Sequence, residues 1–529
     1  MKKLIKSALI ASTAIAGCSL GAFAANYDII IKGATIFDGS GNAGYIADIG
    51  INGEYIAAID VLSTDTAART INAAGLALSP GFIDLHSHAE NGMAVRPLAT
   101  NIVQQGITTI LGGNCGFSPV DIAGYFTALE TKGNIGPNIG LLIGHNNVRE
   151  AVMGKADKHA DADELASMEN VIDAGMKAGA FGISTGLKYV PGAYSNTNEV
   201  IELSKIAAAN NGIYATHMRE EGVGLLDATA ETINIGTTAK IPVHISHHKA
   251  IGLVSWGMTK QSLKMIDDAR NKGQDVTLDQ YPYTASSTGF GILFPAWAQA
   301  GGQDALLKRL ADPVERQKIK DGIIHNIKTD RGGGDPARIQ VAVFKPDPSF
   351  NGKTFKDILI ERGIELTIPN AAELAIEIQS KGGGQAIYHA MHEDDVKRVM
   401  QYRYTSIATD TGAIKFGMGN PHPRGYGTFP RVLGKYVRQE GVLKLPDAIR
   451  KMTSLPASRM GLTDRGSIKV GYFADLVVFN PATIIDSATF ANPHQYAVGI
   501  NYVIINGKIA KNPDGLTDVG SGKALRHGR

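Results

Sequence analysis

Hydrophobic and polar residues alternate with a period of two near both ends of the chain. The alternation covers five segments: residues 27–37, 45–59, 70–78, 467–479 and 498–509. Alternation of this kind, bounded by Asp-Gly, Asn-Gly and Gly-Tyr turns, is typical of antiparallel strands with one buried face. We therefore predict that residues 26–80 and 460–529 together build one small β-sandwich domain.

Between these two ends the pattern changes to short apolar strands that alternate with helices. Helical periodicity is clear in residues 163–178, 199–210 and 259–272. The apolar strands begin near residues 82, 108, 139, 181, 213, 243, 276, 386 and 406. About eight strand–helix units in one run predict an α/β fold, a (β/α)8 TIM barrel over residues 81–459. Nine candidate strands are one too many, and residues 386–392 are the weakest candidate.

Residues 290–385 interrupt this rhythm. They contain two glycine triplets, at 332–334 and 382–384. Glycine clusters between periodic segments are typical of loops and turns. We therefore predict that this stretch is an insertion near the barrel mouth.

The first 24 residues have the composition of a signal peptide. Lys2, Lys3 and Lys6 precede an apolar stretch at 8–16, and Ala22-Phe23-Ala24 offers a cleavage site. This pattern predicts a periplasmic or secreted protein. An alternative is lipidation of Cys18, because Ile15-Ala16-Gly17-Cys18 resembles a lipoprotein cleavage box. No later stretch is apolar enough for a transmembrane segment.

Charge and cysteine content narrow the possible partners. The formal net charge is +2 at pH 7, which gives no electrostatic reason to expect nucleic acid or an anionic membrane as a partner. Cys18 and Cys115 are the only cysteines. If Cys18 is removed or lipidated, Cys115 has no intrachain disulfide partner, and a metal-bound thiolate is a more favourable state for it than a free thiol.

Several residues able to bind a metal lie at the predicted strand ends. His86 and His88 alternate on one face of the strand that begins at Phe82. Four further residues of suitable chemistry end other strands: Cys115, His217, His247 and Asp410. Imidazole, thiolate and carboxylate are the ligands that zinc prefers, and barrel enzymes keep their chemistry at the carboxyl ends of their strands. These six residues therefore predict a zinc site.

The strand that leads to His247 leaves one question open. His244 and His248 share one face of a regular strand, and His247 lies on the opposite face. Periodicity does not say which face looks inward.

The same motifs resemble those of a known family. The run Pro80-Gly81-Phe82-Ile83-Asp84-Leu85-His86-Ser87-His88 resembles the opening metal motif of amidohydrolases. Further motifs are similar to one branch of that superfamily, the D-aminoacylases or N-acyl-D-amino-acid deacylases. These motifs are Gly113-Asn114-Cys115-Gly116, His217-Met218-Arg219, Ser246-His247-His248-Lys249, Asp279-Gln280-Tyr281-Pro282-Tyr283, and Pro421-His422-Pro423-Arg424 with Gly427-Thr428-Phe429. The resemblance extends from about residue 27 to residue 508.

The resemblance implies a role for each residue. Cys115 would bridge two metal positions, and with His217 and His247 it would hold the tighter zinc. His86, His88 and Asp410 would form a second, weaker or optional site. Contacts with the substrate carboxylate and orienting contacts would come from Tyr189, Lys249, Tyr281, Ser287 and Arg424. Lys188, at the end of the fourth strand, is a rival bridging group.

The predicted activity is zinc-dependent hydrolysis of a small-molecule substrate, an N-acyl-D-amino acid, to a carboxylate and a free D-amino acid. Metal-activated water would be the nucleophile, and Asp410 would serve as general base and then general acid. One alternative is another amidohydrolase reaction, on a cyclic amide or a dipeptide. A second alternative is a non-catalytic periplasmic binding protein on the same scaffold.

Overall fold

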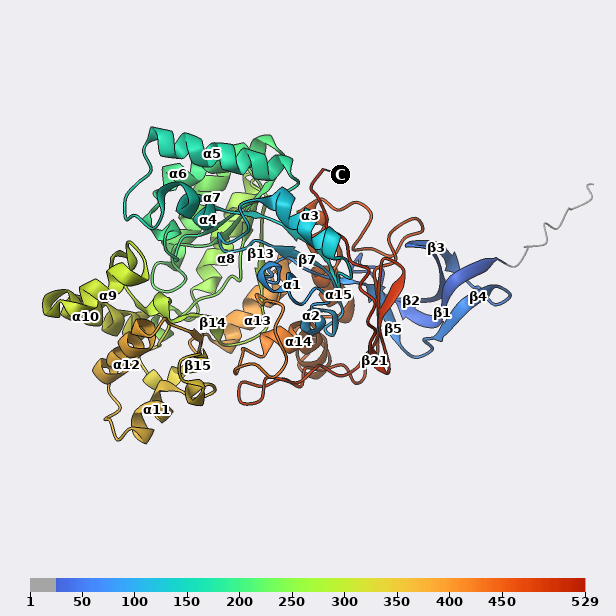
Figure 1. Ribbon diagram of the computed structural model, residues 1–529. Helices are drawn as coiled ribbons and strands as arrows, with labels where there is room; N and C mark the ends of the chain where they lie inside the picture. Colours follow the sequence, from blue (N-terminus) through green and yellow to red (C-terminus); the bar gives the residue numbers. More distant parts are fainter. Residues whose placement is uncertain (1–24, 529) are drawn as a thin grey trace, which may run out of the picture.

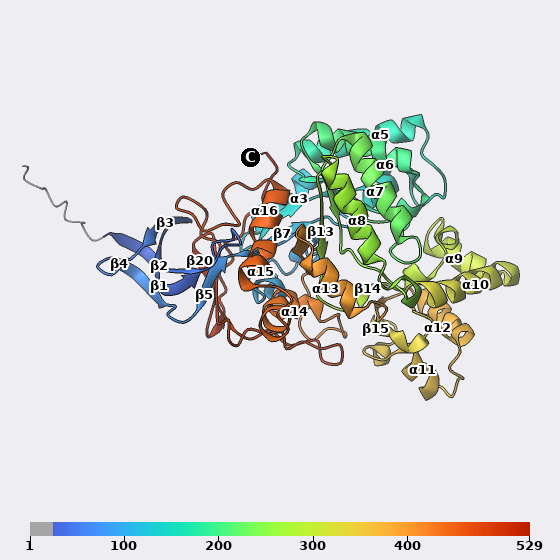
Figure 2. The same ribbon diagram turned by 180° about the vertical axis from the view of Figure 1, so that it is seen from behind.

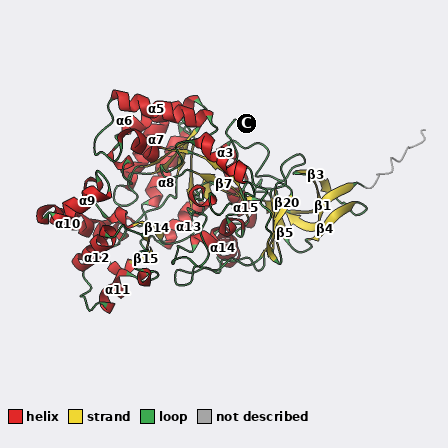
Figure 3. Ribbon diagram, in the orientation of Figure 1, coloured by secondary structure: helices red, strands yellow, loops and turns green. Residues whose placement is uncertain are grey.

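The computed structural model describes residues 25–528, so the predicted leader and Cys18 lie outside the described residues. Strands from the two ends of the chain, blue and red in Figure 1, gather at one end of the molecule. Most helices lie toward the opposite end of the molecule (Figure 3). The same division is visible from behind in Figure 2.

Both chain ends contribute to one nine-stranded sheet. Its strands are β1 (Asn26–Ile36), β2 (Tyr45–Asn52), β3 (Tyr55–Asp60), β4 (Thr66–Asn72), β5 (Ala77–Pro80), β18 (Leu476–Phe479), β19 (Ile500–Ile505), β20 (Lys508–Asn512) and β21 (Gly515–Leu516). The strand order is β21-β20-β19-β18-β5-β1-β2-β3, and β4 pairs with β1. The junction between the two ends is the antiparallel pair of β5 and β18. Ile31, Ile49, Leu476 and Ile504 belong to one buried cluster under this sheet.

Two details of this sheet differ from the prediction. β4 and β5 pair with β1 in parallel, whereas the pattern predicted antiparallel neighbours. Alternation fixes which side chains share a face but says nothing about the direction of the neighbouring strand. The strand expected from residue 467 begins only at Leu476.

The strands of the central region run parallel and are buried. They are β6 (Phe82–Asp84), β7 (Ile107–Gly112), β8 (Asn138–Leu141), β9 (Ile143–Gly144), β10 (Gly182–Gly186), β11 (Ile213–His217), β12 (Val243–Ile245), β13 (Val276–Gln280) and β17 (Thr405–Ile407). Strand pairing groups them into two sheets, β6-β7-β8 and β17-β13-β12-β11-β10-β9. Only Leu142 separates β8 from β9 along the chain. The ends of β6 and β17 also meet, because the Asp410 amide donates to the His86 carbonyl at 2.8 Å.

Helices follow most of these strands. They are α1 (Glu90–Met93), α2 (Thr100–Val103), α3 (Ile122–Lys132), α4 (His145–Met153), α5 (Ala162–Lys177), α6 (Thr197–Ala209), α7 (Leu225–Ala239), α8 (Thr259–Asn271), α13 (Glu393–Gln401), α14 (Arg424–Arg431), α15 (Leu445–Met452) and α16 (Ser454–Met460). A π-helical segment, Val432–Gln439, continues α14. The periodicity predicted α5, α6 and α8 to within two residues. Asp161 and Glu164 form a capping box at the start of α5, which explains its sharp beginning.

The stretch predicted as an insertion has its own sheet and its own core. It contains α9 (Gln303–Ala311), α10 (Pro313–Thr329), α11 (Phe355–Glu361) and α12 (Ile368–Ser380). The antiparallel strands β14 (Ser286–Gly289), β16 (Gln385–Tyr388) and β15 (Ile339–Val343) lie between these helices and the parallel strands. Phe290, Ile323 and Phe355 belong to a buried cluster that is separate from the one around the parallel strands. The surplus ninth candidate strand is therefore β16, which belongs to this antiparallel sheet.

None of the helices within residues 25–528 combines the length and the apolar composition needed to cross a membrane.

Gly113 provides a test of how closely the strand ends are packed. Its φ is +74°, and an added Cβ would lie 2.2 Å from the Leu142 carbonyl oxygen. Gly154 also has a positive φ, +63°, but an added Cβ there meets nothing within 4 Å. Both alanine variants should lose about 1–2 kcal/mol for the backbone conformation. Gly113→Ala should lose about 1–3 kcal/mol more from overpacking. Urea denaturation of both variants measures the difference, and equal losses would contradict the close packing.

Candidate metal centre

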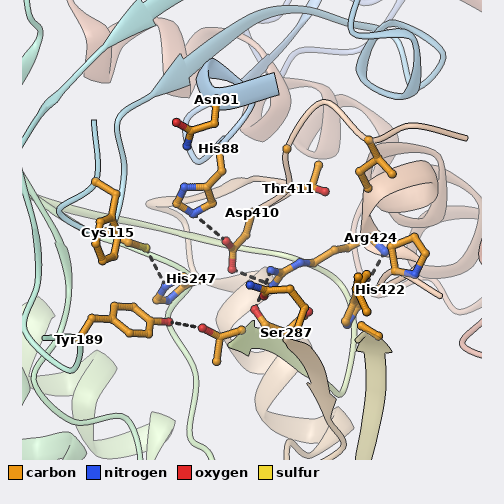
Figure 4. A pocket seen from close by; sticks show the side chains of 18 residues that line it. His88, Asn91, Cys115, Tyr189, His247, Ser287, Asp410, Thr411, His422 and Arg424 are labelled. Atoms are coloured by element: carbon orange, nitrogen blue, oxygen red, sulfur yellow. Dashed lines mark hydrogen bonds and ion pairs between the residues drawn. The ribbon is translucent and has the colours of Figure 1, made fainter. Parts of the chain in front are cut away.

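The structure brings all six predicted ligand residues together at the carboxyl ends of the parallel strands. His86 and His88 follow β6, Cys115 follows β7, and His217 ends β11. His247 follows β12, and Asp410 follows β17. Three groups of three residues have ligand atoms that all lie within 4.8 Å of one another: His86, His88 and Cys115; Cys115, His217 and His247; and His86, His247 and Asp410. Figure 4 shows four of these residues, together with the cavity beside them.

The Cys115 sulfur lies at the middle of this cluster. It is 3.3 Å from His86 Nε2, 3.5 Å from His247 Nε2 and 3.9 Å from His217 Nδ1. Burial raises the pKa of the Cys115 thiol, but the neighbouring His86 and His247 hold that pKa well below its usual range. A buried thiolate among imidazole nitrogens is a donor set that fits a divalent cation such as zinc.

Asp410 completes the second half of the cluster. One of its carboxylate oxygens, Oδ1, is 3.2 Å from His88 Nε2 and 3.6 Å from His86 Nε2. The other oxygen, Oδ2, accepts a hydrogen bond from Arg424 Nη1 at 2.7 Å. Burial raises the pKa of Asp410, but Arg424 and His86 hold it well below its usual range. Asp410 is therefore an ionised carboxylate at the edge of the cluster.

Three of the ligand residues have left-handed backbone conformations. The φ angles are +54° at Cys115, +35° at His247 and +51° at Asp410. Such angles are uncommon outside glycine and concentrate at functional sites. Each of these residues lies two or three positions beyond the end of its strand. The left-handed turn therefore replaces strand alternation in setting the direction of the side chain.

This conformation answers the question left open by the sequence. His247 faces the cluster, whereas His244 and His248 have other partners. His244 Nε2 lies 2.8 Å from Asp279 Oδ2, and His248 Nε2 lies 2.8 Å from Ser262 Oγ. Because β12 ends at Ile245, the alternation that links His244 with His248 does not continue through His247.

A cavity of about 520 Å³ opens beside the cluster. Its lining includes His88, Cys115, His247 and Asp410, together with the predicted substrate contacts Tyr189, Ser287 and Arg424. Arg424 Nη2 donates to the Ser287 carbonyl at 3.2 Å, and the guanidinium lies 4.5 Å from the centre of the Tyr281 ring. The Tyr189 ring packs against His217 with 4.6 Å between centroids, and its hydroxyl accepts a hydrogen bond from Thr288.

The structure places three other predicted residues away from the cavity surface. Lys249 is buried behind His247, where its ammonium donates to the Glu221 carboxylate and to the His247 carbonyl. Tyr281 is buried beneath Arg424 and is not among the residues that line this cavity. Lys188, the rival bridging group, forms ion pairs with Glu220 at 2.5 Å and Asp330 at 2.9 Å. The ammonium of Lys188 is half-buried and paired with these two carboxylates, which lie outside the metal cluster.

The sequence did not reveal the carboxylates behind the histidines. Asp279 Oδ2 lies 3.4 Å from His86 Nδ1, and Glu221 lies beside both His217 and His247. Asp279 stands within one of the resemblance motifs, and Glu221 follows His217 by four residues, but neither spacing indicates a contact. Burial raises the pKa of Glu221, but Lys249 and the two histidines hold it well below its usual range.

Comparisons of sequence and of structure with known proteins find similarity to the same group, the amidohydrolases. A model of the amidohydrolase family matches residues 377–510. The chain is 36% identical to a D-aminoacylase of Alcaligenes xylosoxydans xylosoxydans, over 94% of this chain and 97% of that protein. It is 34% identical to an N-acyl-D-aspartate deacylase of the same organism, over 92% of each chain. The structure of an N-acyl-D-glutamate deacylase from Bordetella bronchiseptica, complexed with zinc and a phosphonate inhibitor, superposes with a TM-score of 0.82. That pair is 32% identical, over 95% of this chain and all of the other.

The central position of Cys115 leads to a prediction about metal content. Cys115→Ala removes the only thiolate of the cluster within residues 25–528, a ligand that belongs to two of the three groups, so metal retained per chain should fall at least about tenfold after dialysis. Elemental analysis of the wild-type protein and the variant, prepared side by side, measures this. Thermal unfolding of both proteins without metal controls for loss of the fold. Full metal content in a folded variant would contradict the assignment.

Proposed function

The chain belongs to the amidohydrolase family of D-aminoacylases and N-acyl-D-amino-acid deacylases and is a hydrolase of linear amides, and from this premise we propose that it acts on N-acyl-D-amino acids with neutral side chains, with zinc as its cofactor. One observation carries the proposal. A single cationic anchor, Arg424, lies in the cavity directly beside the cluster of metal ligands.

The proposed scaffold is a closed (β/α)8 barrel. Support comes from the parallel order of the strands and from the contact between its first and last members. Besides the bond from Asp410 to His86, the His88 amide donates to the Thr411 carbonyl at 2.8 Å. The ligand residues would then stand around one rim, where enzymes of this fold keep their chemistry.

We assign the tighter zinc position to Cys115, His217 and His247, and a weaker or optional position to His86, His88 and Asp410. When bound, zinc supplies Lewis acidity for the acyl carbonyl and lowers the pKa of a water molecule to about 7. The zinc in the related deacylase structure supports this choice of metal. Thiolate and imidazole ligands also favour zinc over magnesium, calcium and manganese, which prefer oxygen ligands.

Asp410 is the proposed proton carrier. Its carboxylate is ionised and lies at the boundary between the ligand cluster and the cavity. It would accept a proton from the attacking water as the new C–O bond forms. It would then return that proton to the amide nitrogen as the C–N bond breaks, which releases a neutral amine.

Arg424 is the proposed anchor for the substrate carboxylate. A guanidinium has five N–H donors, and the contacts with Asp410 and Ser287 use only two of them. The Tyr281 ring beneath the guanidinium holds its plane by a cation–π contact. A carboxylate bound by the remaining donors would therefore be fixed in plane as well as in position.

The cavity lining favours a neutral side chain on the amino acid. Among the eighteen residues that line the cavity, Arg424 is the only lysine or arginine. Phe117, Ala342, Val343 and Ile414 supply apolar surface. An N-acyl-D-glutamate or N-acyl-D-aspartate would bring a second carboxylate into a site that offers no second fixed cation. An unpaired buried charge is costly, so such substrates should bind poorly.

The proposed function is tested with a panel of N-acetyl amino acids and the zinc-loaded protein. We expect kcat/KM for N-acetyl-D-leucine and N-acetyl-D-methionine to exceed that for N-acetyl-D-glutamate by at least about 100-fold, because the second carboxylate stays unpaired. N-acetyl-L-leucine should be a poor substrate. A metal-loaded protein that hydrolyses none of these amides would refute the activity. A preference for the D-glutamate substrate would refute only the side-chain assignment.

A second prediction concerns Arg424. Arg424→Met should lower kcat/KM for N-acetyl-D-leucine at least about 100-fold, because the scissile amide loses its alignment. The same variant should lose much less on N-acetyl-D-leucinamide, which has no carboxylate to anchor. Steady-state kinetics with both substrates in both proteins decides the matter. An equal loss on both would show that Arg424 acts through Asp410 and not through the substrate.

A further inference from the structure

Glu221 lies immediately behind the proposed tighter metal position. It is 1% exposed, and each of its carboxylate oxygens faces one cation and one histidine. Oε1 accepts a hydrogen bond from Lys249 and lies 3.0 Å from His247 Nδ1. Oε2 accepts from Arg331 Nη2 at 2.8 Å and lies 3.4 Å from His217 Nε2. Glu221 therefore contacts both of the histidines that share this metal position with Cys115.

The two histidines turn opposite nitrogens toward that position. His217 Nδ1 and His247 Nε2 are 2.8 Å apart and both face the Cys115 sulfur. An imidazole that binds a metal through one nitrogen carries its proton on the other. The protonated nitrogens would then be His217 Nε2 and His247 Nδ1, and these are the two atoms that face Glu221.

Glu221 is placed to accept both of these protons. His217 Nε2 is buried and has no hydrogen-bond partner among the described residues, and Glu221 Oε2 lies 3.4 Å from it. His247 Nδ1 has two polar neighbours, Glu221 Oε1 at 3.0 Å and Lys249 Nζ at 2.7 Å. An ammonium group donates and does not accept, so Lys249 can bond to Nδ1 only while Nδ1 is unprotonated. When the metal takes Nε2 and Nδ1 carries the proton, Glu221 can accept that proton and Lys249 cannot.

We propose that Glu221 is a positioning residue that fixes the tautomer and the ring orientation of both His217 and His247, and so sets the metal affinity of the position they form with Cys115. The proposal rests on the metal site of the proposed function and is independent of which amide is hydrolysed. It also gives Lys249 a role, because that lysine keeps the shared carboxylate ionised.

The buried cations explain how a carboxylate persists at this place. A buried carboxylate facing only neutral imidazoles would be strongly destabilising, and two fixed positive charges offset that cost. One of them, Arg331, comes from the stretch of 290–385 and follows α10. This stretch therefore contributes a residue to the support of the metal site, although its hydrophobic core is separate.

The contact with Glu221 is selective for one metal position. The far nitrogen of His86 faces another carboxylate, Asp279, at 3.4 Å. A change at Glu221 should therefore weaken the position of Cys115, His217 and His247 and leave the position of His86, His88 and Asp410 less affected.

The first test is Glu221→Gln. An amide offers one acceptor and one donor in place of two acceptor oxygens, so at most one of the two histidines keeps a partner for its proton. The Kd of the tighter zinc, measured by competition with a chromophoric chelator, should rise about 10- to 100-fold. The absorption spectrum of the cobalt-loaded protein should also change, because the geometry of the ligands changes. Glu220→Gln is the matched control: the Glu220 carboxylate pairs with Lys188 and accepts from the Glu221 backbone amide, and a glutamine oxygen can keep that second bond. Its zinc Kd should equal that of the wild-type protein.

Glu221→Asp keeps the charge that Lys249 and Arg331 need, so this variant should fold even if Glu221→Gln does not. It withdraws the carboxylate from the histidines by one methylene, and its zinc Kd should rise at least about tenfold. Thermal unfolding of the metal-free proteins separates affinity from folding. A lower Tm without metal together with a zinc Kd within about twofold of the wild-type value would overturn the proposal. A wild-type protein that binds no zinc would overturn the metal site itself, and that measurement comes first.

Discussion

A buried thiolate surrounded by imidazoles is the constraint on which the rest of this site depends. The Cys115 sulfur lies between 3.3 and 3.9 Å from ring nitrogens of His86, His247 and His217. Lone pairs this close repel one another unless a proton or a cation lies between them. The ligands of a zinc site must also be deprotonated before the metal binds. Several other features of the site orient these side chains toward one another.

The direction of the ligand side chains is set by the strand ends and by the strained turns that follow them directly. The left-handed conformations at Cys115, His247 and Asp410 are costly, and rigid surroundings maintain them. Asp84 supplies part of that rigidity, because its buried carboxylate accepts hydrogen bonds from the backbone amides of both His86 and Thr409. Two ligand-bearing segments far apart in the sequence are thereby fastened to one side chain.

The distribution of charge connects the metal site to substrate choice. Behind the ligands, Lys249 and Arg331 are both paired with Glu221, and Lys188 is paired with Glu220 and Asp330. Their positive charges are therefore compensated inside the protein. Arg424 alone faces the cavity, and it can hold one carboxylate while it stays in contact with Asp410. One anchor that keeps donors beyond those used by Asp410 and Ser287 fits the proposed substrate, which has a carboxylate on its backbone and none on its side chain.

The sequence by itself indicated most of the elements and the residues of the candidate metal centre. Periodicity located the parallel strands and the helices α5, α6 and α8, because burial of one face imposes a repeat that any single segment displays. The ligands could be predicted because each stands close after an apolar strand, and parallel strands bring their carboxyl ends together. The choice between His247 and its neighbours, the parallel pairing of β4 and β5, and the placement of Lys249 were decided only by the tertiary structure. So was the role of Glu221, whose partner Arg331 is 110 residues away along the chain. These features depend on which groups meet across the fold and on backbone angles beyond the strand ends, and local patterns of hydrophobicity carry no information about either.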